Sequence, residues 1–236
     1  MAGIIVELII SWLVLWFICR KHLSVLGFAP TKGRLLHLGI GLLIAGSCYT
    51  LYQLMTTACT NNSWKLNKLV TAKKILESSR WTLISVLYEE LIFRGALLYI
   101  AIKKLSITKA CIISAVCFGI YHWFTFNVFG NPFMMVITFL MTAIVGFSWA
   151  FAFAKTGSVY LPIGLHFGWN LFSTVIFSNG PLGQTILIKA NESQPQGILS
   201  LLIFLFQVAA LPLLTFWYLH WFSKKQDLSK QRLWQA

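Results

Sequence analysis

The chain has 236 residues, of which 58% are hydrophobic and 15% aromatic, and its mean hydropathy is +0.75. Only 11% of the residues are charged, and the formal net charge is +13. This composition argues against a water-soluble protein and predicts a polytopic membrane protein. Because the basic residues flank apolar segments and form no nucleic-acid-binding stripe, the charge favours anionic lipid head groups over nucleic acid as partners.

Seven apolar segments approach the roughly 20 residues that an α-helix needs to cross the hydrocarbon core of a bilayer. In chain order they cover residues 3–19, 35–58, 81–102, 110–123, 132–154, 159–177 and 198–222. We therefore predict an all-α bundle with seven or eight spans, in which segment 110–123 is the weakest. No internal repeat or low-complexity linker divides the chain, so residues 1–236 are expected to form a single integral membrane domain.

The positions of the basic residues predict the orientation, since short loops rich in Lys and Arg stay in the cytoplasm. An N-terminus outside places twelve of these residues inside and six outside. Five of the outer six fall in residues 61–80, a loosely amphipathic stretch that we expect to lie along a membrane surface. The prediction is an integral protein of a bacterial plasma membrane, with the N-terminus outside and the C-terminus cytoplasmic.

Two adjacent acids, Glu89 and Glu90, lie inside the apolar segment 81–101, and Arg94 follows one turn later. A carboxylate at mid-bilayer depth costs about 2.5–3.5 kcal/mol on insertion scales, so such a residue is functional by default. Glu90 and Arg94 share one helix face, whereas Glu89 lies about 100° around the helix. We expect a buried Glu90–Arg94 ion pair and a different helix opposite Glu89.

Three polar residues in later apolar segments are candidate partners of Glu89. His122 ends one segment, and His166 and Asn170 share a helix face in another. A single buried histidine is more often a hydrogen-bonded core residue than a catalyst. In lipid, however, these groups can satisfy only one another, so we expect them to converge around one pocket.

At these positions the sequence resembles the CPBP intramembrane proteases, a family that includes the endopeptidase of prenylated CAAX proteins and bacteriocin-processing or self-immunity proteins. Three motifs carry the resemblance: EExxxR at Glu89, Glu90 and Arg94, FxxxH at Phe118 and His122, and HxxxN at His166 and Asn170. They occur in the family's order within about a third of the chain. Each motif alone is weak, but the three together are specific.

The resemblance implies a helical bundle with an intramembrane polar cavity, a catalytic core over residues 81–178, and hydrolysis of a peptide bond in a membrane-associated or lipid-anchored protein. Glu89 would act as the general base, and His122 would hold the same water. His166 and Asn170 would stabilise the oxyanion. Glu90 and Arg94 would fix the orientation of Glu89.

A metal-dependent version would use nearly the same atoms. Glu89, His122 and His166 match the three-ligand pattern of catalytic zinc with an open fourth position. The residues leave both versions open, so the expected cofactor is either none or Zn.

Two functions of other classes compete with the protease. One is a non-catalytic membrane protein, such as a bacteriocin self-immunity factor or scaffold that retains the motifs. The other is a proton-coupled transporter with Glu89 and the histidines as a relay, but no inverted half repeats or paired broken helices support it. A purely structural polar network is disfavoured, because interhelical hydrogen bonds in bilayers average about 0.6 kcal/mol.

Overall fold

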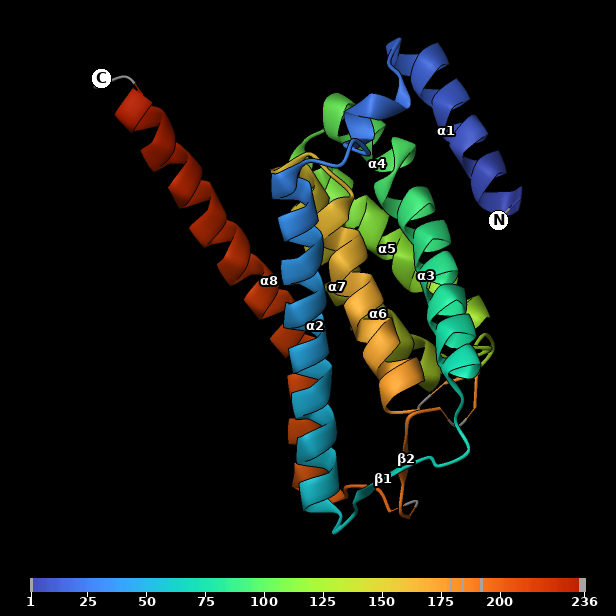
Figure 1. The fold of residues 1–236 in the computed structure, drawn as a ribbon. Helices are drawn as coiled ribbons and strands as arrows, with labels where there is room; N and C mark the ends of the chain where they lie inside the picture. Colours follow the sequence, from blue (N-terminus) through green and yellow to red (C-terminus); the bar gives the residue numbers. More distant parts are fainter. Residues whose placement is uncertain (1, 179, 184, 192, 234–236) are drawn as a thin grey trace.

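The computed structural model describes residues 2–178, 180–183, 185–191 and 193–233. The described chain is almost entirely helical (Figure 1). Its α-helices are α1 (Ala2–Cys19), α2 (Lys32–Cys59), α3 (Ala72–Arg94), α4 (Ala96–Lys104), α5 (Ile107–Thr125), α6 (Pro132–Thr156), α7 (Tyr160–Leu171) and α8 (Gly197–Leu233). A 3₁₀ turn, η1 (Leu23–Leu26), precedes α2, and a π-helical turn, η2 (Phe172–Ile176), continues α7. The predicted all-α class is confirmed.

Four helices are long and apolar enough to cross a membrane: α2, α5, α6 and the part Gly197–Lys224 of α8. The other three predicted spans are shorter or carry charged residues. Helix α1 contributes a shorter apolar stretch, Gly3–Cys19. The first turns of α3 carry charged residues, and α7 has only 12 residues. Several long apolar helices support an integral membrane protein, and the count of seven spans stays a prediction.

The segment predicted as one span over residues 81–102 is two helices, α3 and α4, separated at Gly95. Gly95 has φ −90° and ψ −135°, outside the helical region. A Cβ at this position would collide with the carbonyl oxygen of Leu91. The chain can therefore turn tightly here only with glycine, and the turn follows directly after Arg94.

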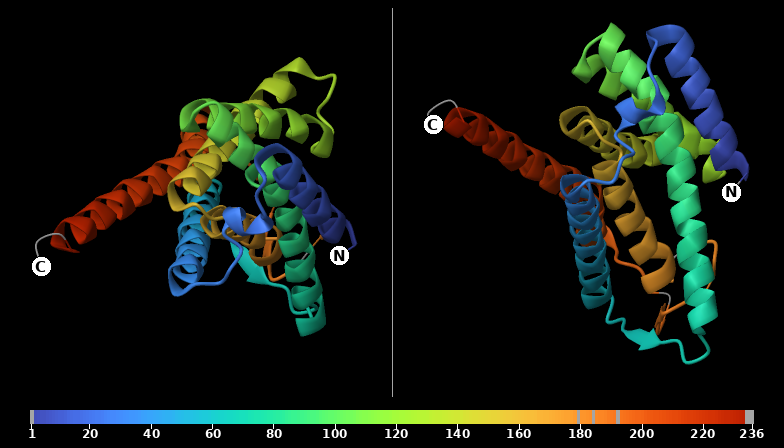
Figure 2. Two further views of the ribbon diagram at one scale, coloured as in Figure 1. Left: turned by 90° about the horizontal axis from the view of Figure 1, so that it is seen from above. Right: turned by 45° about the horizontal axis from the view of Figure 1, so that its top comes forward.

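The basic segment 61–80, predicted to lie along a membrane surface, is not one continuous element. It contains a short strand, β1 (Trp64–Leu66), and the first turns of α3. Strand β1 pairs antiparallel with β2 (Leu187–Lys189), and Lys65 lies opposite Ile188 in the register. This small sheet lies at one end of the bundle, away from α4 (Figures 1 and 2).

Helix α7 packs most extensively against α2, and the contact is made by glycines. A Cβ on Gly164 would collide with the carbonyl oxygen of Leu38, and one on Gly168 would lie 2.7 Å from the carbonyl oxygen of Leu42. Gly164 and Gly168 are one turn apart, a spacing of small residues that lets two membrane helices approach closely. The two glycines flank His166, so the α2–α7 contact positions that histidine.

We expect Gly168→Ala to lower stability by about 1–3 kcal/mol, because the added methyl must push α7 away from α2. Thermal unfolding of the purified protein in detergent measures the effect. Gly39→Ala on α2 is the matched control, since nothing lies within 4 Å of a Cβ there. Equal unfolding temperatures for both variants would show that α2 and α7 are not in this close contact.

Candidate active site

The predicted ion pair between Glu90 and Arg94 is confirmed. Arg94 donates from Nε to Oε2 of Glu90 at 2.9 Å and from Nη2 to Oε1 at 2.6 Å. Both side chains are buried, with 1% of the glutamate and 0% of the arginine exposed. A planar guanidinium with two parallel hydrogen bonds is the strong form of this interaction. The pair fixes one face of α3 in the centre of the bundle.

Glu90 has a second partner on another helix, His166 of α7. Nδ1 of His166 lies 2.7 Å from Oε1 of Glu90. Because a carboxylate can only accept, Nδ1 carries the proton and donates it. The same carboxylate thus holds Arg94 on its own helix and orients the imidazole 76 residues later in the chain.

Glu89 lies between the two histidines. Its Oε2 atom is 3.8 Å from Nε2 of His122 and 3.8 Å from Nε2 of His166. The side chain is 13% exposed. Three helices, α3, α5 and α7, therefore bring the acid and both imidazoles together. In Figure 1, α5 runs at an angle to its neighbours, and His122 lies near the end of this helix.

The hydrogen bonds of the two histidines set which ring nitrogen faces Glu89. Nδ1 of His122 lies 2.8 Å from the carbonyl oxygen of Phe118 and must donate to it. Since both Nδ1 atoms donate, both Nε2 atoms are acceptors when the rings are neutral. Oε2 of Glu89 is buried and has no hydrogen-bond partner among the described residues. Oε2 of Glu89 and Nε2 of neutral His122 are thus two acceptors that face each other with no donor between them. This arrangement fits a water molecule that donates two hydrogen bonds.

Aromatic side chains enclose the charged groups. The Phe118 ring lies 4.3 Å from the guanidinium carbon of Arg94 and packs edge-on against His122 at 4.4 Å. Trp149 of α6 stacks on His166 at 4.3 Å and lies 5.1 Å from Arg94. Such contacts add to ion pairing when the cation is desolvated. They also restrict the rotation of both imidazoles.

Asn170 follows His166 by one turn and is half-buried near the end of α7. Within the described chain, its amide is hydrogen-bonded to none of the other predicted site residues. Its predicted role at the oxyanion stays a prediction. The motif resemblance could identify Asn170, but it could not identify Trp149, which lies outside all three motifs in the apolar helix α6.

The expected metal ligands were tested against the geometry. Among the described residues, no group of three or more His, Cys, Asp or Glu side chains is arranged so that it could hold a metal ion. Ligand atoms of a tetrahedral zinc lie roughly 3.3 Å apart, given bonds of about 2.0–2.1 Å, and the two acid–imidazole distances here are 3.8 Å. As they stand, the donors do not fit the ion, so the metal-ligand set Glu89, His122 and His166 stays a prediction.

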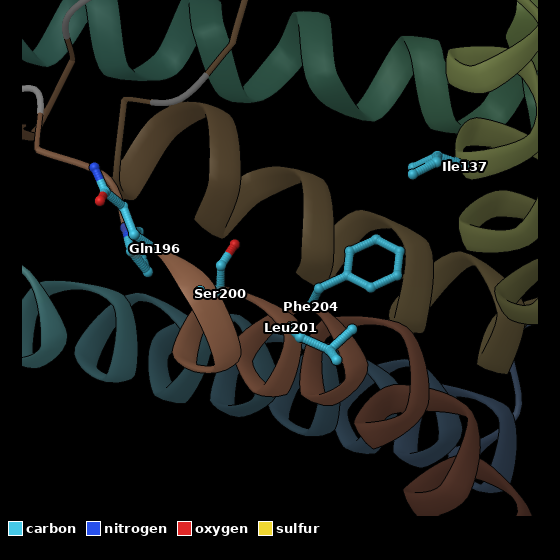
Figure 3. A pocket seen from close by; sticks show the side chains of 7 residues that line it. Ile137, Gln196, Ser200, Leu201 and Phe204 are labelled. Atoms are coloured by element: carbon cyan, nitrogen blue, oxygen red, sulfur yellow. The ribbon is translucent and has the colours of Figure 1, made fainter.

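Two hollows lie near these helices. An apolar cavity of about 490 Å³ between α1, η1, α3 and α7 has Glu90 in its wall, together with Leu87 and Ile163. A second, more open groove of about 660 Å³ lies between α6 and the start of α8, where Ile137 faces Phe204 (Figure 3). None of the predicted site residues lines this second groove. The first cavity is therefore the one connected to the buried acid.

Comparison with known proteins supports the identity of this cluster. The family model that matches is described as type II CAAX prenyl endopeptidase Rce1-like, and it covers residues 71–172. No match was found among curated proteins or among solved structures. The matched region begins just before α3 and ends at the start of η2, so it contains Glu89, Glu90, His122 and His166. Residues 71–172 of this chain are therefore a domain of the Rce1-like type II CAAX prenyl endopeptidase family.

Proposed function

We propose that this protein is an intramembrane endopeptidase in which Glu89 activates a water molecule for attack on a peptide bond. The observation that carries the proposal is the position of Oε2 of Glu89, 3.8 Å from Nε2 of each of two histidines. The family of the domain supports a protein substrate. The apolar cavity beside Glu90 supports a substrate with a membrane-embedded or lipid-anchored end.

Each step of the proposed reaction uses a group of this cluster. Glu89 takes one proton from the water while the water oxygen bonds to the carbonyl carbon, which gives a tetrahedral oxyanion. His166, whose Nδ1 is held by Glu90, donates a hydrogen bond from Nε2–H to that oxyanion, and the Asn170 amide adds a second donor. The carbon–nitrogen bond then breaks, and Glu89 returns the proton to the leaving amine. His122 accepts a hydrogen bond from the water and holds it in place.

We also propose how the protein is oriented in the membrane. The α1–α2, α4–α5 and α6–α7 connections gather at one end of the bundle, opposite the β1–β2 sheet (Figure 1). These connections contain or adjoin Lys and Arg residues, so the positive-inside rule places this end in the cytoplasm. The N-terminus then lies outside, in a bacterial plasma membrane.

A cleavage assay tests the function. The protein is reconstituted in vesicles and incubated with an internally quenched peptide whose farnesylated cysteine lies three residues before its C-terminus. We expect cleavage at the bond after that cysteine, and loss of cleavage in His122→Ala and His166→Ala variants that still insert. Prior treatment with a chelator tests the metal-dependent version. Cleavage that persists in both histidine variants, or is absent from the wild type, would favour the non-catalytic self-immunity or scaffold function.

A further inference from the structure

A third acid, Glu7, lies in the short apolar helix α1, outside the region that matches the family and outside the mechanism above. The chain has only six acidic residues, and each one at bilayer depth is costly. Helix α1 contains no other charged residue between Ala2 and Cys19. Glu7 therefore needs an explanation separate from that of Glu89 and Glu90.

Glu7 belongs to the inward-facing side of α1. The residues on either side of it, Val6 and Leu8, differ: Val6 is 53% exposed, whereas Leu8 lines the apolar cavity beside Glu90. One turn before Glu7, Gly3 packs so closely on the Tyr88 hydroxyl that a Cβ would not fit. Gly3 and Glu7 share a helix face. The carboxylate thus points into the bundle while the lipid-facing side of α1 is apolar.

Oε2 of Glu7 is buried and has no hydrogen-bond partner, and no ion pair forms at Glu7 among the described residues. The other described acids differ in this respect. Glu77 lies 4.0 Å from Lys73, Glu90 is paired with Arg94, and Glu89 faces two imidazoles. Among the four acids whose side chains the structure describes, Glu7 is the one that has no cationic or imidazole partner.

The position of Glu7 is close to the reaction centre. The Tyr88 side chain that contacts α1 directly precedes Glu89. Tyr121 of α5 lies on the same side of the cluster, next to His122 in the chain. The Tyr121 ring, in turn, packs edge-on against His122 at 5.3 Å. Helix α1, which carries Glu7, therefore packs on α3 directly beside the residues that would bind the peptide bond.

We propose that Glu7 binds a Lys or Arg side chain of the substrate peptide and so determines specificity beside the reaction centre. An unpaired carboxylate shielded from water attracts a cation, and none of the side chains that the structure describes supplies one at Glu7. Because Tyr88, which contacts α1, directly precedes Glu89, the basic side chain would lie on the substrate close to the cleaved bond. This inference rests on the proposed endopeptidase function.

Peptide binding tests it independently of turnover. Fluorescein-labelled versions of the assay peptide carry one Lys, Gln or Glu at each of three positions on either side of the bond, and fluorescence anisotropy gives Kd for the full-length Glu89→Gln protein. We expect Lys to bind about tenfold more tightly than Gln at one or more of these positions. Adding Glu7→Gln should remove that preference, and Glu7→Lys should reverse it in favour of Glu.

The matched control is Glu77→Gln, which removes an exposed acid of the same chain and should leave the preference unchanged. The inference is wrong if no position prefers Lys, or if the preference survives Glu7→Gln. If the Glu7→Lys protein fails to insert, Glu7→Gln alone decides. If the wild-type protein cleaves no peptide but still binds the Lys peptides more tightly, the endopeptidase function is wrong and the cation site at Glu7 is retained.

Discussion

Glu89→Gln is expected to lower kcat by about 10³-fold or more while the bundle stays folded. General acid–base catalysis contributes about 10²–10⁴-fold, and this variant cannot accept the proton of the attacking water. The amide has nearly the shape of the carboxylate, so the packing around it is retained. It also brings an N–H donor to a place where Nε2 of neutral His122 and an unpaired Oε2 now face each other. The variant should therefore lose activity without losing stability.

Two measurements on the same preparation check this prediction. The quenched-peptide assay gives kcat and KM, and thermal unfolding in detergent gives the stability. Glu77→Gln serves as the control, because its side chain is 61% exposed and forms only a surface contact with Lys73. Residual activity within tenfold of the wild type would exclude Glu89 as the general base. A large loss of stability would instead indicate a structural role.

Arg94→Met should destabilise the protein by about 3–5 kcal/mol, the second large effect. Removing one partner of a buried ion pair leaves the other charge unpaired. Here the carboxylate left behind is that of Glu90, which is 1% exposed and has only His166 as a remaining partner. The aromatic rings of Phe118 and Trp149 would also lose the cation that they enclose.

The double variant Glu90→Gln, Arg94→Met separates stability from activity. Replacing both charges by neutral groups removes the unpaired carboxylate, so most of the lost stability should return. Activity should not return, because Nδ1 of His166 no longer has an ionised carboxylate that holds and orients the ring. Unfolding temperature and kcat are measured for the single and double variants. Normal stability of Arg94→Met would contradict the buried pair, and an active double variant would contradict the role of Glu90 at His166.

The features that could be predicted from the sequence depend on one helix or on a motif. The Glu90–Arg94 pair follows from a four-residue spacing within α3, which helical geometry alone determines. The meeting of Glu89 with His122 and His166 could be expected from the cost of polar groups in lipid and from the resemblance to a protease family. Neither argument needs knowledge of how the helices are arranged.

The features that could not be predicted depend on contacts between helices. The break at Gly95 was missed because glycine is common within membrane helices. The hydrogen bond from His166 to Glu90 joins residues far apart in sequence, and the stacking of Trp149 on His166 needs α6 in its final place. The span count was uncertain for a related reason, since α7 is short where it is packed against other helices.

The small β1–β2 sheet has a mechanical consequence for the reaction centre. It connects the chain entering α3 with the chain leaving α7, and Asn62 reinforces it with hydrogen bonds to the backbone of Asn191. Inside the bundle, the hydrogen bond between His166 and Glu90 joins the same two helices. Helices α3 and α7 are thus joined at two separate points, which should limit sliding and twisting between them. Thermal motion should therefore seldom separate Glu90 from His166.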